Sequence, residues 1–265
     1  MQYKQIRCDS LINDITTKDD LFVGDYTIDP YQHCEFGCRY CDSTVDDIIY
    51  IKTNAVEVLE MELEQRKKGR IVVGSVHDPY QNAEVEYKIT RELLEVIEQY
   101  DFSCHILTKS PLVLRDKDIL SRMESSLVTV SITSLDEQTS KLFEKHVPLP
   151  KERLQAIQAL SENEIKTGLA VMPILPFIME NEFEDLVKSA RNYNARYVIH
   201  KHLELKGDQR TKYMTIIQEH FPKLMKKYDE LYQDSYMPNT AYISDINKSM
   251  EQWYKEYKIK NRIET

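Results

Sequence analysis

The chain contains little glycine and proline, 6 and 9 residues among 265, which excludes a collagen-like or low-complexity protein. It also lacks any stretch near the roughly 18 consecutive apolar residues that a membrane-spanning helix needs. The first residues, MQYKQIRCDSLIND, have no apolar core of a signal peptide. Hydrophobic residues make up 42% and charged residues 30%, which excludes an intrinsically disordered chain. We therefore expect a globular, cytoplasmic protein with no membrane partner.

Basic residues are outnumbered, with 35 Lys and Arg against 44 Asp and Glu, and the net charge is -9. A surface of that sign repels phosphate backbones unless its basic residues gather on one face. One segment deviates, because positions 191–228 hold nine Lys or Arg and three acidic residues. With the tyrosines between them, these residues predict either a basic stacking surface for single-stranded nucleic acid or a solvated helical face.

Cysteines are few as well, and their number, five, is odd. Three of them, Cys34, Cys38 and Cys41, lie within eight positions, spaced C-x3-C-x2-C. This spacing is more typical of metal ligation than of a secreted disulfide framework. In a reducing compartment the three residues are thiols available to a metal.

Short apolar runs alternate with amphipathic segments along most of the chain. The runs predict strands at 22–28, 70–76, 103–109, 127–133, 168–176 and 196–205. Apolar residues at three- and four-residue intervals predict helices at 54–68, 86–100, 112–123, 151–162 and 180–193. Such alternation requires a parallel sheet covered by helices, that is, an α/β protein.

The count of about six βα units predicts a partial (βα)6 TIM-type barrel, short of the eight units of a closed one. A doubly wound open sheet is the alternative, because counting repeats does not show whether the sheet curls. From about residue 206 the strand signals end and a mostly helical extension follows. We expect an N-terminal segment over 1–21 packed on the barrel, the barrel over 22–205 and the extension over 206–265.

The three clustered cysteines follow the first predicted strand of the barrel. Thiolates are soft ligands, so three in one loop favour an iron–sulfur cluster or zinc. A structural zinc needs a fourth ligand, and the adjacent His33 is awkwardly placed to chelate the same ion as Cys34. A [4Fe–4S] cluster bound by three cysteines instead leaves one iron open to a chelating cofactor.

Polar residues follow several predicted strands. The segment GSVHDPYQ carries Ser75, His77, Asp78, Tyr80 and Gln81 after the second strand. A turn between strand and helix would explain Asp78-Pro79, but not the number of polar residues around it. After the next two strands come Lys109 and Ser131. If both point inward, a cation and a hydroxyl meet at the barrel mouth and suit a ligand carboxylate. Arg153 either supports the same carboxylate or interacts with a helix face.

Other residues are weaker candidates. His200 and His202 share one strand face and either line the lumen or are satisfied in the barrel wall, so we assign them no catalytic role. Cys104 has the opposite parity to Lys109, and we expect it to pack outward against helices. Cys8 and Tyr80 are possible radical relays.

The segment YTIDPYQHCEFGCRYCDS resembles the cluster-binding motif of the radical S-adenosylmethionine (SAM) superfamily, including the aromatic Tyr40 before the third cysteine. Together with GSVHDPYQNAE, TKSPLVLRD, VSITSLDE and GLAVMPILPFI, it looks like the spore photoproduct lyase-like branch, often labelled DNA repair photolyases. The resemblance runs from about Cys8 through the predicted barrel and into the C-terminal extension.

This resemblance implies that Cys34, Cys38 and Cys41 bind a [4Fe–4S] cluster whose open iron binds the amino and carboxylate groups of SAM. One electron, from a reductant such as flavodoxin or ferredoxin, then cleaves SAM to methionine and a 5′-deoxyadenosyl radical. The expected SAM contacts are Tyr40, Ser75, Asp78, Lys109, Ser131 and Arg153. Tyr80 is the catalytic candidate.

The resemblance implies a nucleic-acid lesion as the substrate. In spore photoproduct lyase, however, the stretch equivalent to GSVHDPYQ supplies a cysteine that returns a hydrogen atom, and Ser75 stands at that position here. An O–H bond is too strong to donate a hydrogen atom readily, which argues against spore photoproduct repair itself. A radical SAM enzyme acting on a small molecule or peptide is the second hypothesis. The third is a nucleic-acid-binding module that holds an iron–sulfur cluster or zinc without turnover.

Overall fold

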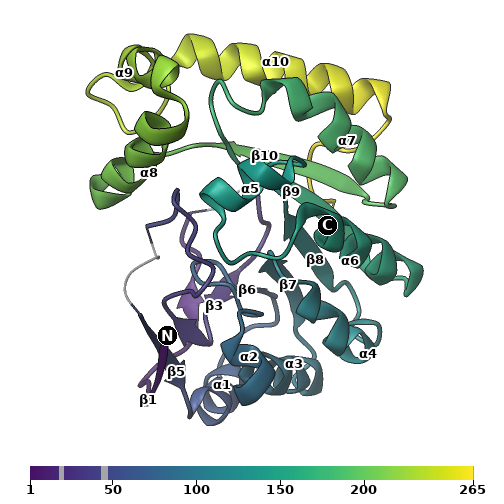
Figure 1. Cartoon of the computed structure of the whole chain (residues 1–265). Coiled ribbons are helices and arrows are strands. Elements are labelled where there is room, and N and C mark those ends of the chain that lie inside the picture. The colour runs from purple at the N-terminus through teal and green to yellow at the C-terminus, as the bar shows by residue number, and fades with distance from the viewer. Residues whose placement is uncertain (18–20, 43–46, 265) are drawn as a thin grey trace.

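The computed structural model describes residues 1–17, 21–42 and 47–264. Its main sheet contains six parallel strands and one antiparallel edge strand (Figure 1). The parallel strands are β3 (Tyr26–Ile28), β6 (Arg70–Val73), β7 (Ser103–Thr108), β8 (Leu127–Ser131), β9 (Lys166–Ile174) and β10 (Tyr197–His202). The antiparallel strand, β2 (Asn13–Asp14), pairs with β3.

The parallel strands stand in the sheet in the order in which they occur along the chain, from β3 at one side to β10 at the other. A doubly wound sheet reverses its strand order at a switch point, so that alternative is wrong. Among the described strands, β3 and β10 do not pair with each other, and the sheet stays open. This arrangement confirms a partial (βα)6 TIM-type barrel.

Helices connect the parallel strands. They are α1 (Ala55–Leu63), α2 (Ala83–Tyr87), α3 (Ile89–Gln99), η1 (Pro111–Asp116), α4 (Lys117–Leu120), α5 (Glu137–Phe143), α6 (Pro150–Glu162), η2 (Glu180–Glu182) and α7 (Phe183–Asn192). The helix expected over 86–100 is interrupted at Lys88, whose φ of 55° is left-handed. Helix α5 was not among the predicted helices; Asp136 caps it by accepting a hydrogen bond from the Thr139 backbone N–H at 2.7 Å.

A second, smaller sheet was not predicted. It consists of β1 (Gln2–Ile6), β5 (Ile48–Lys52) and β4 (Tyr31–Gln32), with β5 in the middle. The sequence QYKQI of β1 has no apolar alternation, and four of its five residues are exposed. Its strand conformation comes from parallel pairing with β5, a contact between segments more than 40 residues apart.

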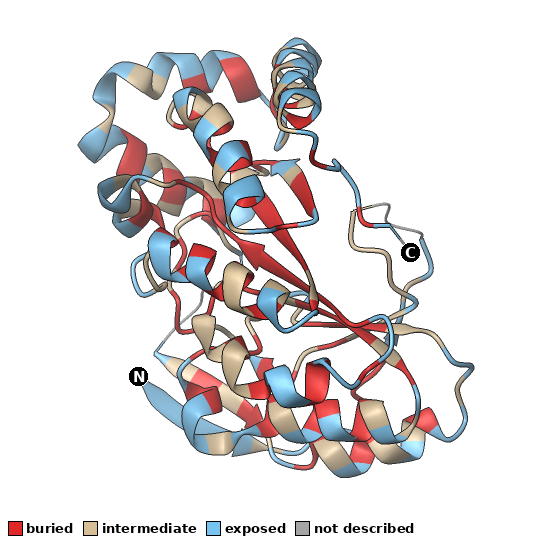
Figure 2. Cartoon of the chain, turned by 90° about the vertical axis from the view of Figure 1, so that its right-hand side faces the viewer, coloured by how far each residue is buried: buried red, intermediate tan, exposed pale blue. Residues whose placement is uncertain are grey.

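The chain after β10 is helical, as expected. It forms α8 (Gly207–His220), η3 (Pro222–Leu224), α9 (Met225–Tyr232) and α10 (Thr240–Glu256), and the three α-helices gather at one end of the molecule (Figure 1). Figure 2 shows buried residues along the strands and on the inward sides of the helices. Core residues of the extension, such as Met250, belong to the same hydrophobic cluster as residues of the barrel strands. The predicted boundaries at 21/22 and 205/206 stay predictions.

The tyrosines of segment 191–228 do not form a stacking surface. Tyr197, Tyr213 and Tyr228 are at most 3% exposed, and Tyr193 is half-buried. Their rings pack in the core because burying an aromatic ring removes a large apolar area from water. None of the described helices combines the length and the apolar character needed to cross a membrane.

Candidate functional site

The cysteine-bearing loop, residues 33–42, follows β4 and is held by backbone contacts to residues 143–146 at and after the end of α5. Gly37 has a φ of 63°, a conformation that glycine adopts without strain, and it allows the chain to turn between the first two cysteines. Cys38 forms an isolated β-bridge with Glu144. On either side, the Arg39 N–H donates to the Phe143 carbonyl at 2.8 Å and the His146 N–H to the Phe36 carbonyl at 3.0 Å.

The GSVHDPYQ loop holds the cysteine-bearing loop from the other side. The buried Gln81 accepts from the Glu35 N–H at 2.9 Å and donates to the His33 carbonyl at 3.0 Å. The Glu35 carboxylate in turn accepts from the Ala83 N–H at 2.6 Å. The two loops therefore lie side by side, and Gln81 joins them through its side-chain amide.

The three candidate ligands lie close enough to influence one another electrostatically. Burial, then the charge of Asp78, raises the pKa of Cys34 to about 12. Burial also raises the pKa of Cys38 well above its usual value; Lys109 opposes this increase, while Glu144, Cys34 and Cys41 add to it. In the part of the chain that the structure describes, no three His, Cys, Asp or Glu side chains are grouped to hold one metal ion.

Lys109 lies beside these cysteines, at the carboxyl end of β7. Its Nζ is 5.7 Å from the centre of the Tyr40 ring, and its charge acts on Cys38. A cation near the buried Cys38 thiol favours its thiolate form, which is the form that binds metal. Cys104, of opposite parity on the same strand, is fully buried, with its Sγ 3.9 Å from the Met123 Sδ. This confirms the expected outward packing of Cys104.

Ser75 is exposed, and Asp29 holds its loop. The Ser75 hydroxyl donates to the Asp29 carboxylate at 3.0 Å, and the backbone N–H groups of Val76 and His77 donate to the same carboxylate, each at 3.0 Å. Asp29 directly follows β3, so it joins the ends of two neighbouring strands. Sequence reasoning did not single out Asp29; its position after a strand, before Pro30, is the signal that was available.

The carboxylate of Asp78 forms hydrogen bonds within the protein. It accepts from the Thr108 hydroxyl at 2.7 Å and from the N–H groups of Lys109 and Tyr80 at 2.6 and 2.9 Å. Burial raises the pKa of Asp78, although these hydrogen bonds act in the opposite direction. Asp78 therefore joins the ends of β6 and β7 and fixes the backbone that carries Lys109.

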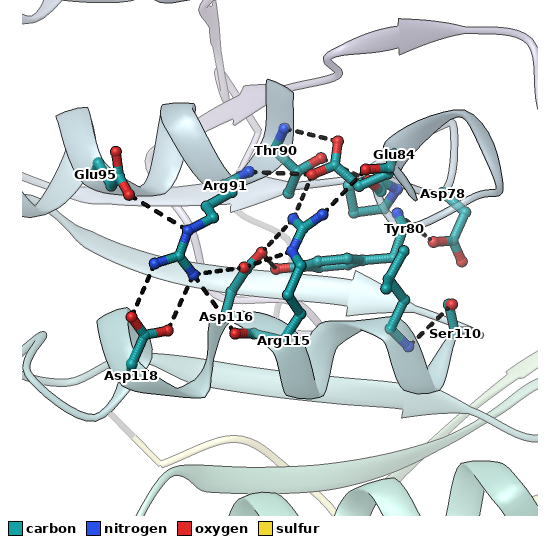
Figure 3. Close-up of polar contacts among 12 residues, drawn as sticks. Asp78, Tyr80, Glu84, Thr90, Arg91, Glu95, Ser110, Arg115, Asp116 and Asp118 are labelled. Atoms are coloured by element: carbon teal, nitrogen blue, oxygen red, sulfur yellow. Dashed lines mark hydrogen bonds and ion pairs between the residues drawn. The ribbon is translucent and has the colours of Figure 1, made fainter. Parts of the chain in front are cut away.

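Tyr80 lies inside a buried ionic network (Figure 3). Its ring points away from Asp78, and its hydroxyl donates to Asp116 at 3.0 Å. Tyr80 is 1% exposed, and burial, then the charge of Asp116, raises its pKa well above the usual value. These contacts give Tyr80 a structural role, and its predicted catalytic role stays a prediction.

The ionic network contains two buried acids, Glu84 and Asp116, and two arginines (Figure 3). Arg115 donates to Glu84 at 2.5 Å and to Asp116 at 2.7 Å, and Arg91 donates to Asp116 at 2.9 Å. Glu84 also accepts from the hydroxyl of Tyr31, three residues before Cys34. The network thus fastens α2, α3 and η1 beneath the GSVHDPYQ loop and the strand that leads to the cysteines.

Ser131 and Arg153 meet at the end of β8. The Arg153 guanidinium is fully buried, donating to the Ser131 carbonyl at 2.8 Å and to the Glu144 carboxylate at 2.6 Å. Its charge is therefore matched inside the protein. Glu144 also accepts from the Tyr40 hydroxyl, so Tyr40 and Arg153, two predicted SAM contacts, meet at an acid that sequence reasoning missed. No periodic or motif signal marks Glu144.

His200 and His202 share a strand face, as expected, and this face is the one that α10 covers. The Nε2 atoms of both rings lie about 3 Å from the Asn247 Oδ1, and the His200 Nδ1 lies 2.7 Å from the Tyr254 hydroxyl. Burial lowers the pKa of both histidines. The structure thus favours barrel-wall positions over lumen-lining ones. Both ring nitrogens of His200 are hydrogen-bonded, whereas the Nδ1 of His202 is buried without a hydrogen-bond partner.

Residues 28–190, more than half of the chain, match the radical SAM superfamily. Among curated relatives, an uncharacterised protein of Methanocaldococcus jannaschii is 30% identical over 168 residues, which span 60% of this chain and 63% of that protein. An uncharacterised protein of Mycobacterium tuberculosis is 26% identical over 257 residues, covering 89% of this chain and 75% of that protein. The matched stretch therefore spans less than two thirds of the archaeal relative.

Solved structures share the fold at low sequence identity. Spore photoproduct lyase in complex with dinucleoside spore photoproduct superposes with a TM-score of 0.74 at 15% identity, covering 96% of this chain and 79% of that one. Streptococcus suis SuiB bound to its precursor peptide SuiA gives 0.62 at 14% identity, covering 89% and 47%. The fold is thus like that of spore photoproduct lyase, and the match to residues 28–190 shows that this chain belongs to the radical SAM superfamily.

Proposed function

We propose that this protein is a radical SAM enzyme that cleaves SAM reductively at a [4Fe–4S] cluster bound by Cys34, Cys38 and Cys41, and that it acts on a nucleic-acid lesion. The observation that carries the proposal is the placement of the three thiols. They lie in one loop at the carboxyl edge of the parallel strands, with the Lys109 cation close to Cys38. Sites of barrel enzymes form at that edge.

The residues present fit such a cluster. Each cysteine of a three-cysteine cluster binds a different iron atom, so the three thiolates need not meet around a single ion. The loop is held by backbone hydrogen bonds on one side and by the Gln81 side chain on the other. Lys109 offsets part of the negative charge at Cys38. When bound, the cluster and SAM together supply a 5′-deoxyadenosyl radical that abstracts a hydrogen atom from the substrate.

The protein's own residues bind and orient the cofactor in this proposal. We propose that Lys109 and Ser131 bind the SAM carboxylate; Ser75 is exposed on the neighbouring loop. The polar groups of Tyr40, Asp78 and Arg153 are already engaged within the protein. We expect these three residues to act mainly by fixing the backbone of the site.

A nucleic-acid substrate is supported by the fold, which is shared with a lyase solved with a dinucleoside lesion. Ser75 gives the chain a hydroxyl where that family has a cysteine, so we expect hydrogen abstraction without hydrogen return from position 75. An electron carrier such as a flavodoxin or ferredoxin supplies the electron, and we place the reaction in the cytoplasm. A peptide is the second candidate substrate, because SuiB, solved with its precursor peptide, shares the fold as well.

The test is anaerobic purification, reconstitution with iron and sulfide, reduction, addition of SAM and an assay for 5′-deoxyadenosine. The wild type should form it, and Cys38→Ala should not. Lys109→Met should keep the cluster but lose about 10-fold or more of the activity, because a charged contact to the cofactor is removed. The proposal would be contradicted by a colourless protein that binds zinc, or by a cluster whose electron paramagnetic resonance spectrum does not change when SAM is added.

Binding of lesion-containing oligonucleotides and of peptides to the reconstituted protein then separates the two substrate classes. A nucleic-acid substrate should bind with an affinity that falls steeply as salt rises, because phosphate contacts release counterions. Binding of peptides alone would support the second candidate.

A further inference from the structure

Glu144 lies against the cysteine-bearing loop both through its backbone and through its side chain. Its backbone bridges Cys38, between the hydrogen bonds that Phe143 and His146 make to the same loop. Its carboxylate accepts from the hydroxyl of Tyr40, the residue directly before Cys41. Glu144 is therefore in contact with residues next to two of the three cysteines.

The Glu144 carboxylate is fully engaged. It is 1% exposed and accepts from the hydroxyls of Thr133 at 3.0 Å and Ser140 at 3.3 Å, in addition to Tyr40. Arg153, fully buried, donates to its other side at 2.6 Å. Four groups from four different segments thus meet at one side chain.

The charge of Glu144 is maintained despite burial. Burial raises its pKa, but Arg153, Lys109 and the Tyr40 hydroxyl outweigh that effect and lower the pKa below its ordinary value. A buried ion pair contributes little net stability compared with a hydrophobic pair of similar volume. Its fixed geometry, in contrast, restricts every group that it holds, which suits a site where ligand positions must be precise.

We propose that Glu144 is a positioning residue that holds the cluster-binding cysteines in place through Tyr40. This inference rests on the proposed function, since it requires a cluster at Cys34, Cys38 and Cys41. Through Arg153 and the Ser131 carbonyl, the same carboxylate links the cysteine-bearing loop to the end of β8. The distance between the end of β8 and the cysteine-bearing loop is therefore fixed, and a cofactor bound between them would contact both.

Two variants test the inference, with one matched control. Glu144→Gln removes the charge and leaves Arg153 unpaired, whereas Tyr40→Phe removes only the hydroxyl and keeps the Glu144–Arg153 pair. The control, Glu182→Gln, alters a half-buried carboxylate that accepts from the Leu135 N–H and the Ser134 hydroxyl, with no bond to the cysteine-bearing loop. The measurements are the rate at which a chelator removes iron from reconstituted protein and the electron paramagnetic resonance spectrum with and without SAM.

Both variants should lose iron about 10-fold faster than wild type and show an altered, broadened spectrum, while the control behaves like wild type. The melting temperatures of the cluster-free variants are compared with that of the cluster-free wild type, because a lowered value would identify a general loss of stability as the cause of faster iron release. If Tyr40→Phe and every folded Glu144 variant release iron at the wild-type rate with an unchanged spectrum, the inference is wrong. A wild type that holds the cluster without cleaving SAM would overturn the proposed function, yet the iron-release rates would still decide the inference. A wild type that takes up no cluster would overturn both.

Discussion

His105 illustrates how a single side chain is constrained on the inner face of the sheet. Its Nδ1 lies 2.7 Å from the Phe22 carbonyl, and its Nε2 lies 2.6 Å from the Thr129 hydroxyl, which in turn contacts the Tyr197 hydroxyl at 2.6 Å. Because a carbonyl only accepts, Nδ1 carries the proton and Nε2 accepts from Thr129. His105 is therefore neutral, and burial lowers its pKa to about 4.

This depressed pKa predicts a loss of stability in mild acid. The unfolded chain takes up a proton on His105 near pH 6.5, whereas the folded chain takes it up only near pH 4. The stability that depends on neutral His105 is thus complete above about pH 6.5 and is lost progressively as pH falls to 4, by about 3 kcal/mol in total. Urea unfolding at pH 7 and pH 5 should show a smaller difference for His105→Gln than for wild type. An equal difference in the two proteins would contradict this assignment.

At the scale of elements, the ionic network of Glu84, Asp116, Arg91 and Arg115 determines how α2, α3 and η1 sit under the site. Glu84 accepts from the N–H groups of Thr90 and Arg91, so it also serves the first turn of α3. The same network includes an exposed member, Asp118, which pairs with Arg91 at 2.9 Å. Buried and exposed acids thus contact the same arginine.

The two kinds of acid should differ strongly in their effect on stability. Removing Glu84, which is fully buried, takes one of two carboxylate partners from Arg115 and leaves the Tyr31 hydroxyl and two backbone N–H groups without their acceptor. Glu84→Ala should therefore cost about 3–5 kcal/mol of unfolding free energy. Asp118→Ala removes a half-exposed partner and should cost less than about 1 kcal/mol. Equilibrium urea unfolding measures both, and similar costs would contradict the difference in burial.

At the scale of the whole molecule, the helical extension is joined to the barrel by one hydrophobic cluster. Ile246, Met250 and Tyr254 of α10 are buried in the same cluster as strand residues such as Val198 and Val171. A continuous core of this kind couples the unfolding of its parts, because opening one part exposes apolar surface of the other.

We therefore expect the cluster-free protein to unfold in one transition. Trp253, the single tryptophan, lies in α10 and reports on the extension, whereas far-ultraviolet circular dichroism reports on all helices and strands. The two signals should change at the same urea concentration. A fluorescence transition at lower urea would instead indicate that the extension unfolds separately and would support a domain boundary near residue 206.

The amino-acid sequence was sufficient to predict the repeating βα pattern, the helical tail, the three-cysteine loop and its superfamily, and the outward packing of Cys104. These features depend on local periodicity or on close spacing, which a linear chain displays directly. The order of the strands, which excludes the doubly wound alternative, required pairing between distant segments. The β1–β5–β4 sheet depended on such pairing as well.

The surroundings of the candidate site, in contrast, follow from contacts between distant segments of the chain. Glu144 is 110 residues from Cys34 along the chain, and Asp29 is 46 from Ser75, so no spacing rule connects either pair. The structure also placed Tyr80 in an ionic network, gave Arg153 an internal partner and buried the tyrosines of segment 191–228. A residue type states which hydrogen bonds and charges a side chain offers. Which partner it meets, and whether water is excluded there, depends on the packing of elements far apart in the sequence.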